Sequence, residues 1–378
     1  MSGVTAELAA ILERAKERPK NLSAKELATL VAAADGLSRE AVRVAAREVK
    51  RRHCGNLVSI RGIVELGNIC SKDCCYCGIR KSNSSLQRYR LKVGDVVRMA
   101  RTNRDLGYGS IVLQGGEIES EENTRFIEEC LEGIAELDLG VTLSLGEQTE
   151  DVYRRWKEAG ASRYLLRIET SNPALYARLH PPGHSWERRR ECLAALGRCG
   201  YQVGTGVMCA LPGQTAADLA DDIVFYGEID ADMIGMGPYI PHPDTPLAAQ
   251  APPLSDAERL ELGLNMIAAT RLYLHDVNIA ATTALQALAD DGRERGILAG
   301  ANVVMPNVTD VGYRARYQLY AGKPCLNENA SLCRGCLERR IESIGEKINW
   351  RARGDSPHYH DRLRRLNLPN STIDTPRK

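Results

Sequence analysis

The sequence predicts a (β/α)8 barrel of the TIM type, an α/β fold, with a helical extension before it and a further extension after it. Short β-rich runs alternate with amphipathic helical stretches, and eight such runs can be counted. At 378 residues the chain is long enough for one barrel with extensions. A doubly wound sheet is the alternative architecture, because strand counts depend on boundaries that sequence patterns define poorly.

The expected strands are short runs of mainly apolar and β-branched residues, and the expected helices carry apolar residues at helical spacing. The strands are expected at 57–64, 111–114, 141–145, 163–167, 202–207, 233–236, 277–280 and 302–305. Helices are expected between them at 93–106, 125–137, 188–199, 216–229 and 257–274.

The chain divides into four expected segments. Residues 1–52 are rich in Ala, Glu, Lys and Arg and predict two helices packed against one end of the barrel, which spans 53–310. A C-terminal segment at 311–348 carries a second group of cysteines. The Arg-rich end, 349–378, has few apolar residues and is expected to be a flexible tail.

Charge and hydropathy indicate a water-soluble enzyme. There are 50 Lys and Arg against 49 Asp and Glu, a net charge of +1, so no global field attracts nucleic acid or an anionic membrane. No run approaches the ~18 apolar residues of a membrane span. The polar opening at 1–18 has no apolar signal segment, and we therefore expect a cytoplasmic location.

Three cysteines, Cys70, Cys74 and Cys77, form a CxxxCxxC motif. Three thiolates from one loop hold three corners of a 4Fe-4S cluster and leave the fourth iron open for chemistry. Structural zinc with Cys75 or Cys54 as fourth ligand is an alternative. A disulfide framework fits worse, since no segment directs the chain to an oxidising compartment.

In a barrel of this kind, functional side chains collect where strands end and loops begin. The cysteine loop follows the first strand, and the second strand is followed by Gly115, Gly116 and Glu117. Glycines there let backbone approach a ligand closely, and Glu117 offers a carboxylate for an ammonium group. A plain strand-to-helix turn is the alternative.

Alternation along the fourth strand places Arg163, Arg167 and Glu169 on one face. The apolar alternate face should contact the helices, which turns these charges into the barrel, where they need a partner or a ligand. We expect a site for an anionic substrate, and an Arg167–Glu169 ion pair is the alternative. In the third strand, hydroxyls line the same cavity at Thr142 and Ser144.

Seven runs of the sequence together indicate a family. In order along the chain they are CSKDCCYCGIR, TLSLGE, RYLLRIETSNP, ALPGQT, MGPYIPHPDTPLA, ATTA and GANVVMPN. These runs resemble the HydE family of FeFe-hydrogenase maturases, which are radical S-adenosylmethionine (SAM) enzymes. The resemblance covers roughly 57–336, and biotin synthase and methylornithine synthase are related families.

This resemblance implies a 4Fe-4S cluster with SAM at the top of the barrel and an internal cavity for a small-molecule or organometallic substrate. It implies reductive cleavage of SAM to methionine and a 5′-deoxyadenosyl radical, in assembly of the di-iron site of the hydrogenase. The implied partners are a reducing electron donor, such as a flavodoxin or ferredoxin, and other hydrogenase maturases.

The resemblance also implies individual roles. Arg189 could instead lie on a solvated helix face, and the methionines could be core residues. SAM contacts are implied for Tyr76, Glu169, Arg189 and Met208. Substrate contacts are implied for Thr142, Arg163, Arg167, Thr282, Thr283, Met305, Tyr317 and Tyr320.

A second group, Cys325, Cys333 and Cys336, has a Cx7CxxC spacing. It resembles the accessory site of some HydE proteins, which implies a 2Fe-2S or 4Fe-4S cluster away from the catalytic centre, with zinc or free thiols as alternatives. Two positions depart from the family pattern: Ile168 stands where a histidine is expected, and Gly115 where a serine is expected.

Two other functions stay open at this point. One is a carbon-skeleton rearrangement or sulfur insertion, as in methylornithine synthase or biotin synthase. The other is a non-catalytic iron-sulfur carrier, which would need neither a SAM site nor inward-facing arginines. Neighbouring genes for a hydrogenase or for pyrrolysine assembly would discriminate between the two enzyme functions.

Overall fold

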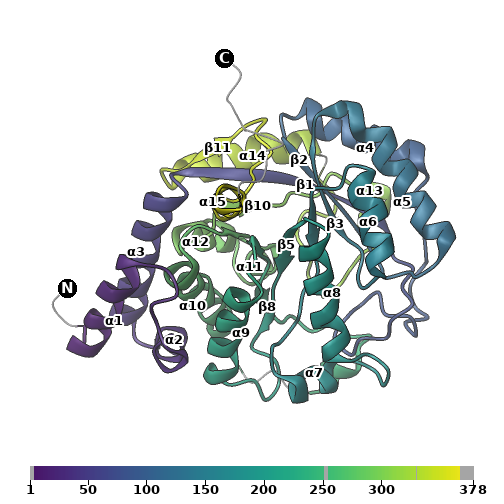
Figure 1. The fold of residues 1–378 in the computed structure, drawn as a ribbon. Helices are drawn as coiled ribbons and strands as arrows, with labels where there is room; N and C mark the ends of the chain where they lie inside the picture. Colours follow the sequence, from purple (N-terminus) through teal and green to yellow (C-terminus); the bar gives the residue numbers. More distant parts are fainter. Residues whose placement is uncertain (1–3, 251–253, 329, 367–378) are drawn as a thin grey trace.

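Eight parallel strands curl into a barrel in the computed structural model, which describes residues 4–250, 254–328 and 330–366 (Figure 1). Neighbouring strands follow the order β10, β1, β2, β3, β4, β5, β7, β9. A backbone bridge between Ala280 and Val303, and a 2.9 Å hydrogen bond from Asn302 N–H to Ile279 O, join the last strand to the first. The predicted (β/α)8 barrel is therefore confirmed.

All eight expected strands are present, with shifts of a few residues at their ends. They are β1 (Leu57–Gly67), β2 (Ser110–Gly115), β3 (Gly140–Ser144), β4 (Arg163–Leu165), β5 (Gln202–Thr205), β7 (Met233–Ile234), β9 (Asn278–Ile279) and β10 (Val303–Val304). Two further short strands, β6 (Met208–Cys209) and β8 (Gly237–Pro238), pair with each other beyond β5 and β7.

Register fixes which side chains face the interior. Thr142 lies opposite Arg163, which lies opposite Gln202, so these three share the inner face. The alternate residue Tyr164 is fully buried on the outer face and stacks on Trp156 of α6 (Glu150–Glu158), with ring centroids 6.4 Å apart. The predicted division of this strand into a polar inner face and an apolar outer face is thus correct.

Helices surround the strands, and many of them begin at a polar N-cap residue. Thr215 and Ser255 are two such residues, and each forms a complete capping box. The five expected helices correspond to α4 (Val93–Asp105), α5 (Glu121–Ile134), α8 (Trp186–Arg198), α9 (Ala216–Glu228) and α10 (Asp256–Leu274). A further helix, α7 (Pro173–Leu179), precedes α8, and three short helices follow α10: α11 (Thr283–Leu288), α12 (Gly292–Leu298) and α13 (Val311–Arg314).

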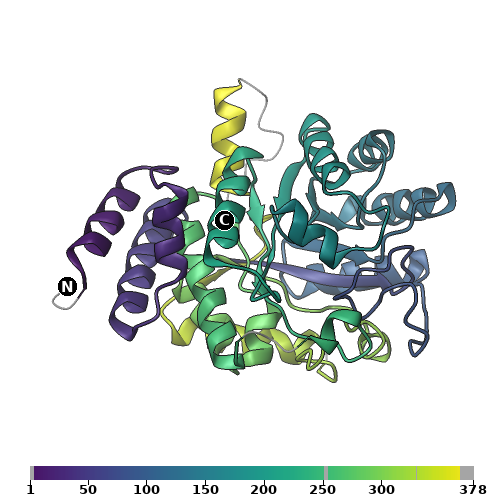
Figure 2. The same ribbon diagram turned by 90° about the horizontal axis from the view of Figure 1, so that it is seen from below.

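The N-terminal extension contains three helices, α1 (Ala6–Glu17), α2 (Ala24–Val31) and α3 (Gly36–His53), where two were expected. The Asp35 side chain caps α3 by accepting a hydrogen bond from the N–H of Ser38, so α2 and α3 are separate helices. The three helices lie beside α9 and α10 (Figures 1 and 2). Asn265 of α10 donates hydrogen bonds to the carbonyls of Val31 and Ala33 there.

The C-terminal segment contains α14 (Ala330–Ser343), β11 (Lys347–Asn349) and α15 (Pro357–Arg365), and β11 pairs with the start of β1. The expected flexible tail is therefore wrong for residues 349–366. His358 and Arg362 anchor α15 through ion pairs with Asp230 at 2.8 and 3.1 Å. Ion pairs and hydrogen bonds hold this segment in place where it lacks apolar residues. Positions 367–378 lie outside the described residues.

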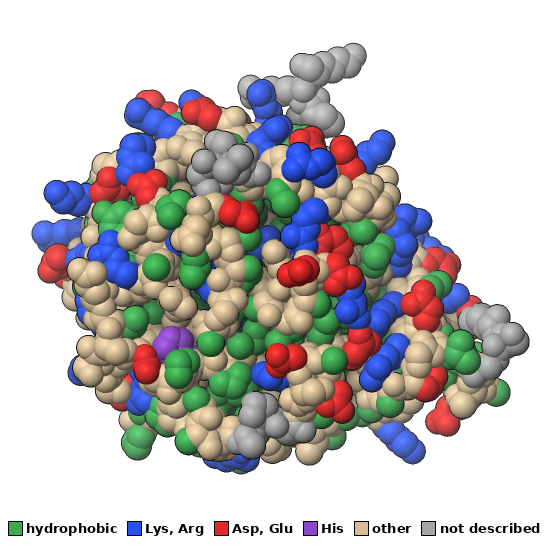
Figure 3. Space-filling model, turned by 180° about the vertical axis from the view of Figure 1, so that it is seen from behind, with side chains coloured by type: hydrophobic (Ala, Val, Ile, Leu, Met, Phe, Trp, Pro, Cys, Tyr) green, Lys and Arg blue, Asp and Glu red, His purple; other side chains and the backbone are tan. Residues whose placement is uncertain are grey.

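In the part of the chain that the structure describes, no helix is both long enough and apolar enough to cross a membrane. On the face drawn in Figure 3, acidic and basic side chains are interspersed.

Candidate functional site

The cysteine loop leaves the end of β1 at the mouth of the barrel. Backbone N–H groups support it: that of Lys72 lies 3.5 Å from Sγ of Cys70, and that of Cys77 bonds the carbonyl of Cys74 at 3.3 Å. Burial raises the pKa of all three predicted ligand thiols, that of Cys77 to about 12. Metal binding therefore has to displace protons here.

The loop fits a cubane cluster in its chemistry. Within the described ranges no three His, Cys, Asp or Glu side chains are gathered to hold a single ion. A cubane instead takes one thiolate at each of three irons, which three cysteines of one loop supply. The amide donors next to the thiols are the kind of group that tunes iron-sulfur sites.

Gly116 lies directly under this loop. A Cβ at that position would come within 2.1 Å of the Ile69 carbonyl oxygen and 2.8 Å of the Cys70 Cβ, so only glycine lets the backbone pass this close to the cysteine loop. Gly115 ends β2, opposite Gly67 of β1. Glu117 is buried, and its carboxylate lies 3.0 Å from Nζ of Lys72.

Glu169 turns its side chain into the mouth just beyond β4. Its φ is +67°, a left-handed backbone conformation that costs free energy in a non-glycine residue and is typical of functional sites. Arg167 Nη2 lies 3.2 Å from Oε2 of Glu169 and donates a 2.7 Å hydrogen bond to the carbonyl of Val207. The Arg167–Glu169 ion pair, the alternative considered from sequence, is therefore present, with Arg167 one-third exposed.

Arg189 lies on the buried face of α8, not on a solvated one. Its Nε donates a 2.6 Å hydrogen bond to Glu147, and Nη1 bonds the carbonyl of Arg167 at 2.5 Å. Nearby, the Tyr76 hydroxyl lies 3.3 Å from Nε2 of the buried His180. The Arg189 contacts join α8 to the residues that follow β3 and β4, and the Tyr76 contact joins the cysteine loop to the residue that follows α7.

Met208 belongs to a small apolar cluster against which Tyr76 packs, so these two expected SAM contacts lie together. The backbone N–H of Met208 bonds the carbonyl of Glu169 at 3.3 Å. Ser144 ends β3 in register with Gln114, half-buried at the same mouth.

Arg163 does not face a substrate site, which corrects the sequence prediction. It lies at the start of β4, at the opposite end of the barrel from the cysteine loop. Its guanidinium forms a buried ion pair with Asp355 and donates to Ser110 Oγ at 3.1 Å and to the carbonyl of Arg353 at 2.7 Å. The C-terminal segment supplies the partner that the sequence pattern left open.

The remaining expected substrate contacts lie along the interior and mouth. Thr142 is fully buried, and its Oγ1 has no hydrogen-bond partner among the described residues. Thr283 and Tyr320 share a 2.7 Å hydrogen bond between their hydroxyls. The others are Thr282, bonded to the carbonyl of Met236 at 3.2 Å; Met305, half-buried after β10; and Tyr317, whose hydroxyl accepts from Gln114 at 3.2 Å.

The second cysteine group lies in the loop that follows α13 and on α14. Cys325 has a positive φ of +60°, and its carbonyl accepts a 3.0 Å hydrogen bond from the buried Arg314. Cys333 and Cys336 lie on α14, one buried and one half-buried. Burial raises the pKa of Cys325 and of Cys333.

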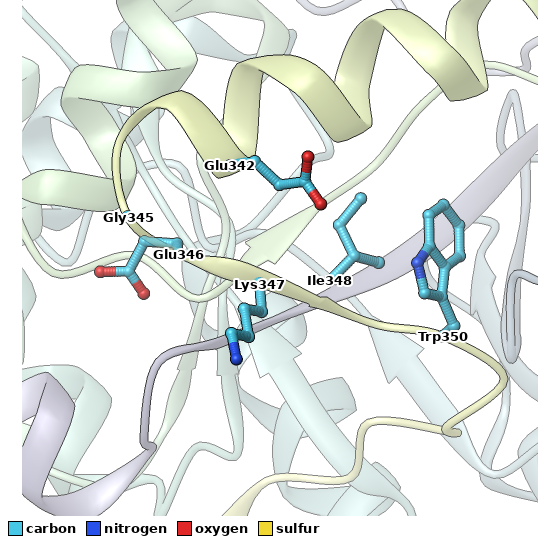
Figure 4. Close-up of a pocket in the computed structure, with 6 residues that line it drawn as sticks. All are labelled: Glu342, Gly345, Glu346, Lys347, Ile348 and Trp350. Carbon is cyan, nitrogen blue, oxygen red and sulfur yellow. The ribbon is translucent and has the colours of Figure 1, made fainter.

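A groove of about 410 Å³ runs along β11, lined by Glu342, Gly345, Glu346, Lys347, Ile348 and Trp350 (Figure 4). Since β11 pairs with the start of β1, this groove lies at the other end of that strand from the cysteine loop. The Glu346 carboxylate points away from Ile348 and Trp350, and Lys50 of α3 lies 2.8 Å from it.

Several residues of the site were missed by sequence reasoning. Glu147 ends the TLSLGE run, so its place after a strand was a usable signal. Lys72 lies inside the cysteine motif and was equally visible. His180 follows α7. The ammonium group of Lys323 pairs with the buried Glu65, which lies far from Lys323 in sequence. No local sequence pattern indicates a role for His180 or for Lys323.

Comparison with known proteins agrees with this geometry. The radical SAM superfamily pattern matches residues 64–225. The [FeFe] hydrogenase maturase subunit HydE of Thermotoga maritima is 46% identical over 308 residues, 82% of this chain and 86% of that protein. Biotin synthase 1 of Corynebacterium diphtheriae is 29% identical over 69% of this chain and 73% of that protein.

Among solved structures, methylornithine synthase (PylB) superposes with a TM-score of 0.77 and 24% identity, covering 90% of this chain and 98% of that one. This likeness confirms the fold. Members of the radical SAM superfamily use a 4Fe-4S cluster and SAM, so the cluster predicted from the cysteine motif and the SAM implied by the family resemblance are confirmed. From the match over most of its length, the chain belongs to the HydE family of radical SAM enzymes.

Proposed function

We propose that this protein is a maturase that acts on a small organometallic substrate during assembly of the di-iron site of FeFe-hydrogenase. The observation that carries the proposal is the 46% identity to a HydE subunit over most of both chains. The biotin synthase relative is much less similar, at 29% identity. The likeness to methylornithine synthase concerns the fold alone.

In this proposal Cys70, Cys74 and Cys77 hold the 4Fe-4S cluster. Glu169 and Arg189 bind SAM beside it, with Tyr76 and Met208 packing against the nucleoside. When bound, the cluster and SAM supply a 5′-deoxyadenosyl radical by reductive cleavage of SAM. Exclusion of water from the interior of the barrel would protect this reactive species.

Arg167 is proposed to bind the anionic part of the substrate. Its side chain is one-third exposed, and its carboxylate partner Glu169 lies 3.2 Å away, outside good hydrogen-bond geometry. A charged, partly exposed guanidinium suits a polar anion such as a cyanide-bearing iron complex. Thr142 is proposed as a further contact deeper in the barrel, where it lies in register with Arg163 and its buried hydroxyl has no partner among the described residues.

The accessory cysteines Cys325, Cys333 and Cys336 are proposed to carry a second cluster of the 2Fe-2S or 4Fe-4S type that takes no part in SAM cleavage. A reducing donor such as a flavodoxin or ferredoxin is proposed to supply the electron. Contact with other hydrogenase maturases belongs to the same proposal, because the product has to reach the hydrogenase.

An in vitro maturation assay tests the proposal. Apo-hydrogenase is supplied with every maturase except its HydE component, and this protein is added after anaerobic reconstitution. Hydrogen evolution should appear only with the added protein and SAM. SAM cleavage without any hydrogenase activation would contradict the proposed substrate and leave the radical SAM assignment intact.

A further inference from the structure

Arg88 follows the cysteine loop in sequence, and its guanidinium contacts backbone on both sides of that loop. Nη1 donates hydrogen bonds to the carbonyl of Asn68, before Cys70, and to that of Ile79, after Cys77, at 2.5 and 2.8 Å. Nη2 donates to the carbonyls of Arg80, Lys81 and Asn83 at 2.5, 3.2 and 3.0 Å.

This arrangement closes the loop into a ring around the predicted cluster ligands. Five carbonyl oxygens converge on one cation, and without it they would repel one another and lose hydrogen bonds. Other contacts support the same ring: Asn83 Nδ2 donates to the carbonyl of Gly78 at 2.7 Å, and Asn68 accepts from the N–H of Tyr89 at 2.8 Å.

The guanidinium of Arg88 contacts carbonyl groups of this loop and no carboxylate among the described residues. Arg80 in the same loop, by contrast, pairs with Asp73 at 2.7 Å. Hydrogen bonds from a charged donor are stronger than those between neutral groups. The guanidinium therefore stabilises the carbonyl dipoles of the loop.

We propose that Arg88 is a positioning residue that holds residues 68–83 in the shape in which Cys70, Cys74 and Cys77 reach one cluster. The inference goes beyond the proposed function, since it concerns assembly of the cluster site whatever the substrate. Its tests therefore use no hydrogenase, and their failure leaves the maturase proposal untouched.

The fork shape of the side chain is central to the proposal. Arginine presents donors on two separate amino groups in a fixed plane, while lysine has one ammonium centre that cannot reach both sides of the ring. Arg88→Lys keeps the charge and loses the fork, and Arg88→Gln loses both. Arg90→Gln is the matched control, because Arg90 points outward to Glu122 at 2.8 Å.

The first measurement is limited trypsin digestion of the apoprotein, with fragments identified by mass spectrometry. Cleavage after the exposed Lys81 should accelerate about tenfold or more in both Arg88 variants. The rate of cleavage depends on how often the loop opens, and loss of the Arg88 hydrogen bonds lowers the free energy of that opening. Arg90→Gln should match the parent. Cleavage spread along the whole chain, with a lowered melting temperature, would indicate a general stabilising role and overturn the proposal.

The second measurement is iron content after anaerobic reconstitution, in a background with Cys325, Cys333 and Cys336 changed to Ser. In this background the measured iron is the iron bound by Cys70, Cys74 and Cys77. Both Arg88 variants should lose most of the bound iron, and Arg90→Gln should keep it. Parental iron content and parental cleavage in both variants would overturn the proposal, as would full rescue by Arg88→Lys, because charge alone would then suffice.

Discussion

Arg163 and Asp355 form a buried ion pair that joins the inside of the fourth strand to a segment almost two hundred residues further on. The Arg163 and Asp355 side chains are 1% and 3% exposed. Burial alone would raise the pKa of Asp355, but Arg163 and a hydrogen bond from Gln202 outweigh it and lower the pKa. The C-terminal segment thus closes the barrel at the end away from the cysteine loop.

This pair leads to a stability prediction. Asp355→Ala strands a buried guanidinium and should cost roughly 3–5 kcal/mol of unfolding free energy. The double variant Arg163→Met, Asp355→Leu should recover most of that loss, since a well-packed apolar pair is often as stable as a buried ion pair. Denaturant unfolding checks both. A double variant as unstable as Asp355→Ala would contradict the account.

The same pair shows where sequence reasoning ends. The alternation of polar and apolar residues in the fourth strand correctly predicted that Arg163 faces the interior, because successive side chains of a strand point to opposite faces. The partner could not be predicted, because the closing segment is polar and its order comes from contacts such as Asp355 with Arg163 and His358 with Asp230. Low apolar content therefore predicted a tail where polar pairs hold an ordered segment.

His358 predicts a pH dependence of stability. Burial opposes its charge, but hydrogen bonds to Asp230 and Asp276 outweigh burial and raise its pKa to about 9. Because the folded pKa lies above the ordinary value of about 6.5, the stabilisation is complete below pH ~6.5 and is lost as pH rises through ~9. The nearby Arg362 keeps its charge throughout this range.

Urea unfolding between pH 6 and 10 measures this effect. The parent should lose about 1–2 kcal/mol across the window after allowance for solvent screening, and His358→Gln should be nearly flat there. An equal slope in both proteins would mean that another group carries the titration.

Arg167 tests the substrate contact. Arg167→Gln should reduce hydrogenase maturation far more than it weakens SAM binding, since a charge-assisted hydrogen bond is typically worth roughly 1.5–3 kcal/mol. Arg167→Lys should recover part of the activity. A large fall in melting temperature would instead mean that Arg167 serves mainly as the partner of Glu169, whose Oε2 is buried.

The accessory cysteines give a separate prediction. Changing Cys325, Cys333 and Cys336 to Ser should lower iron content and leave SAM cleavage largely intact, because these residues follow the last barrel strand and lie apart from the first loop. Iron analysis beside 5′-deoxyadenosine formation checks this. Complete loss of SAM cleavage in a folded protein would show that the second site is not peripheral.

Much of the candidate site followed from local sequence. The CxxxCxxC spacing and the glycines after the second strand are contiguous motifs, and strand ends in a barrel meet at one mouth. Glu147 with Arg189 and Lys323 with Glu65 are contacts between distant segments. Their side chains are ordinary surface-type residues in sequence, and only the fold shows that they are buried and paired.

The cluster assignment is the central claim, and formation of 5′-deoxyadenosine by the reconstituted, reduced protein with SAM tests it most directly. Cys74→Ala should abolish the product and remove the iron bound at the first loop. The adjacent Cys75→Ala is the matched control and should retain both, since Cys75 lies outside the three-cysteine spacing. A Cys74→Ala protein that forms 5′-deoxyadenosine at the parental rate would contradict the account.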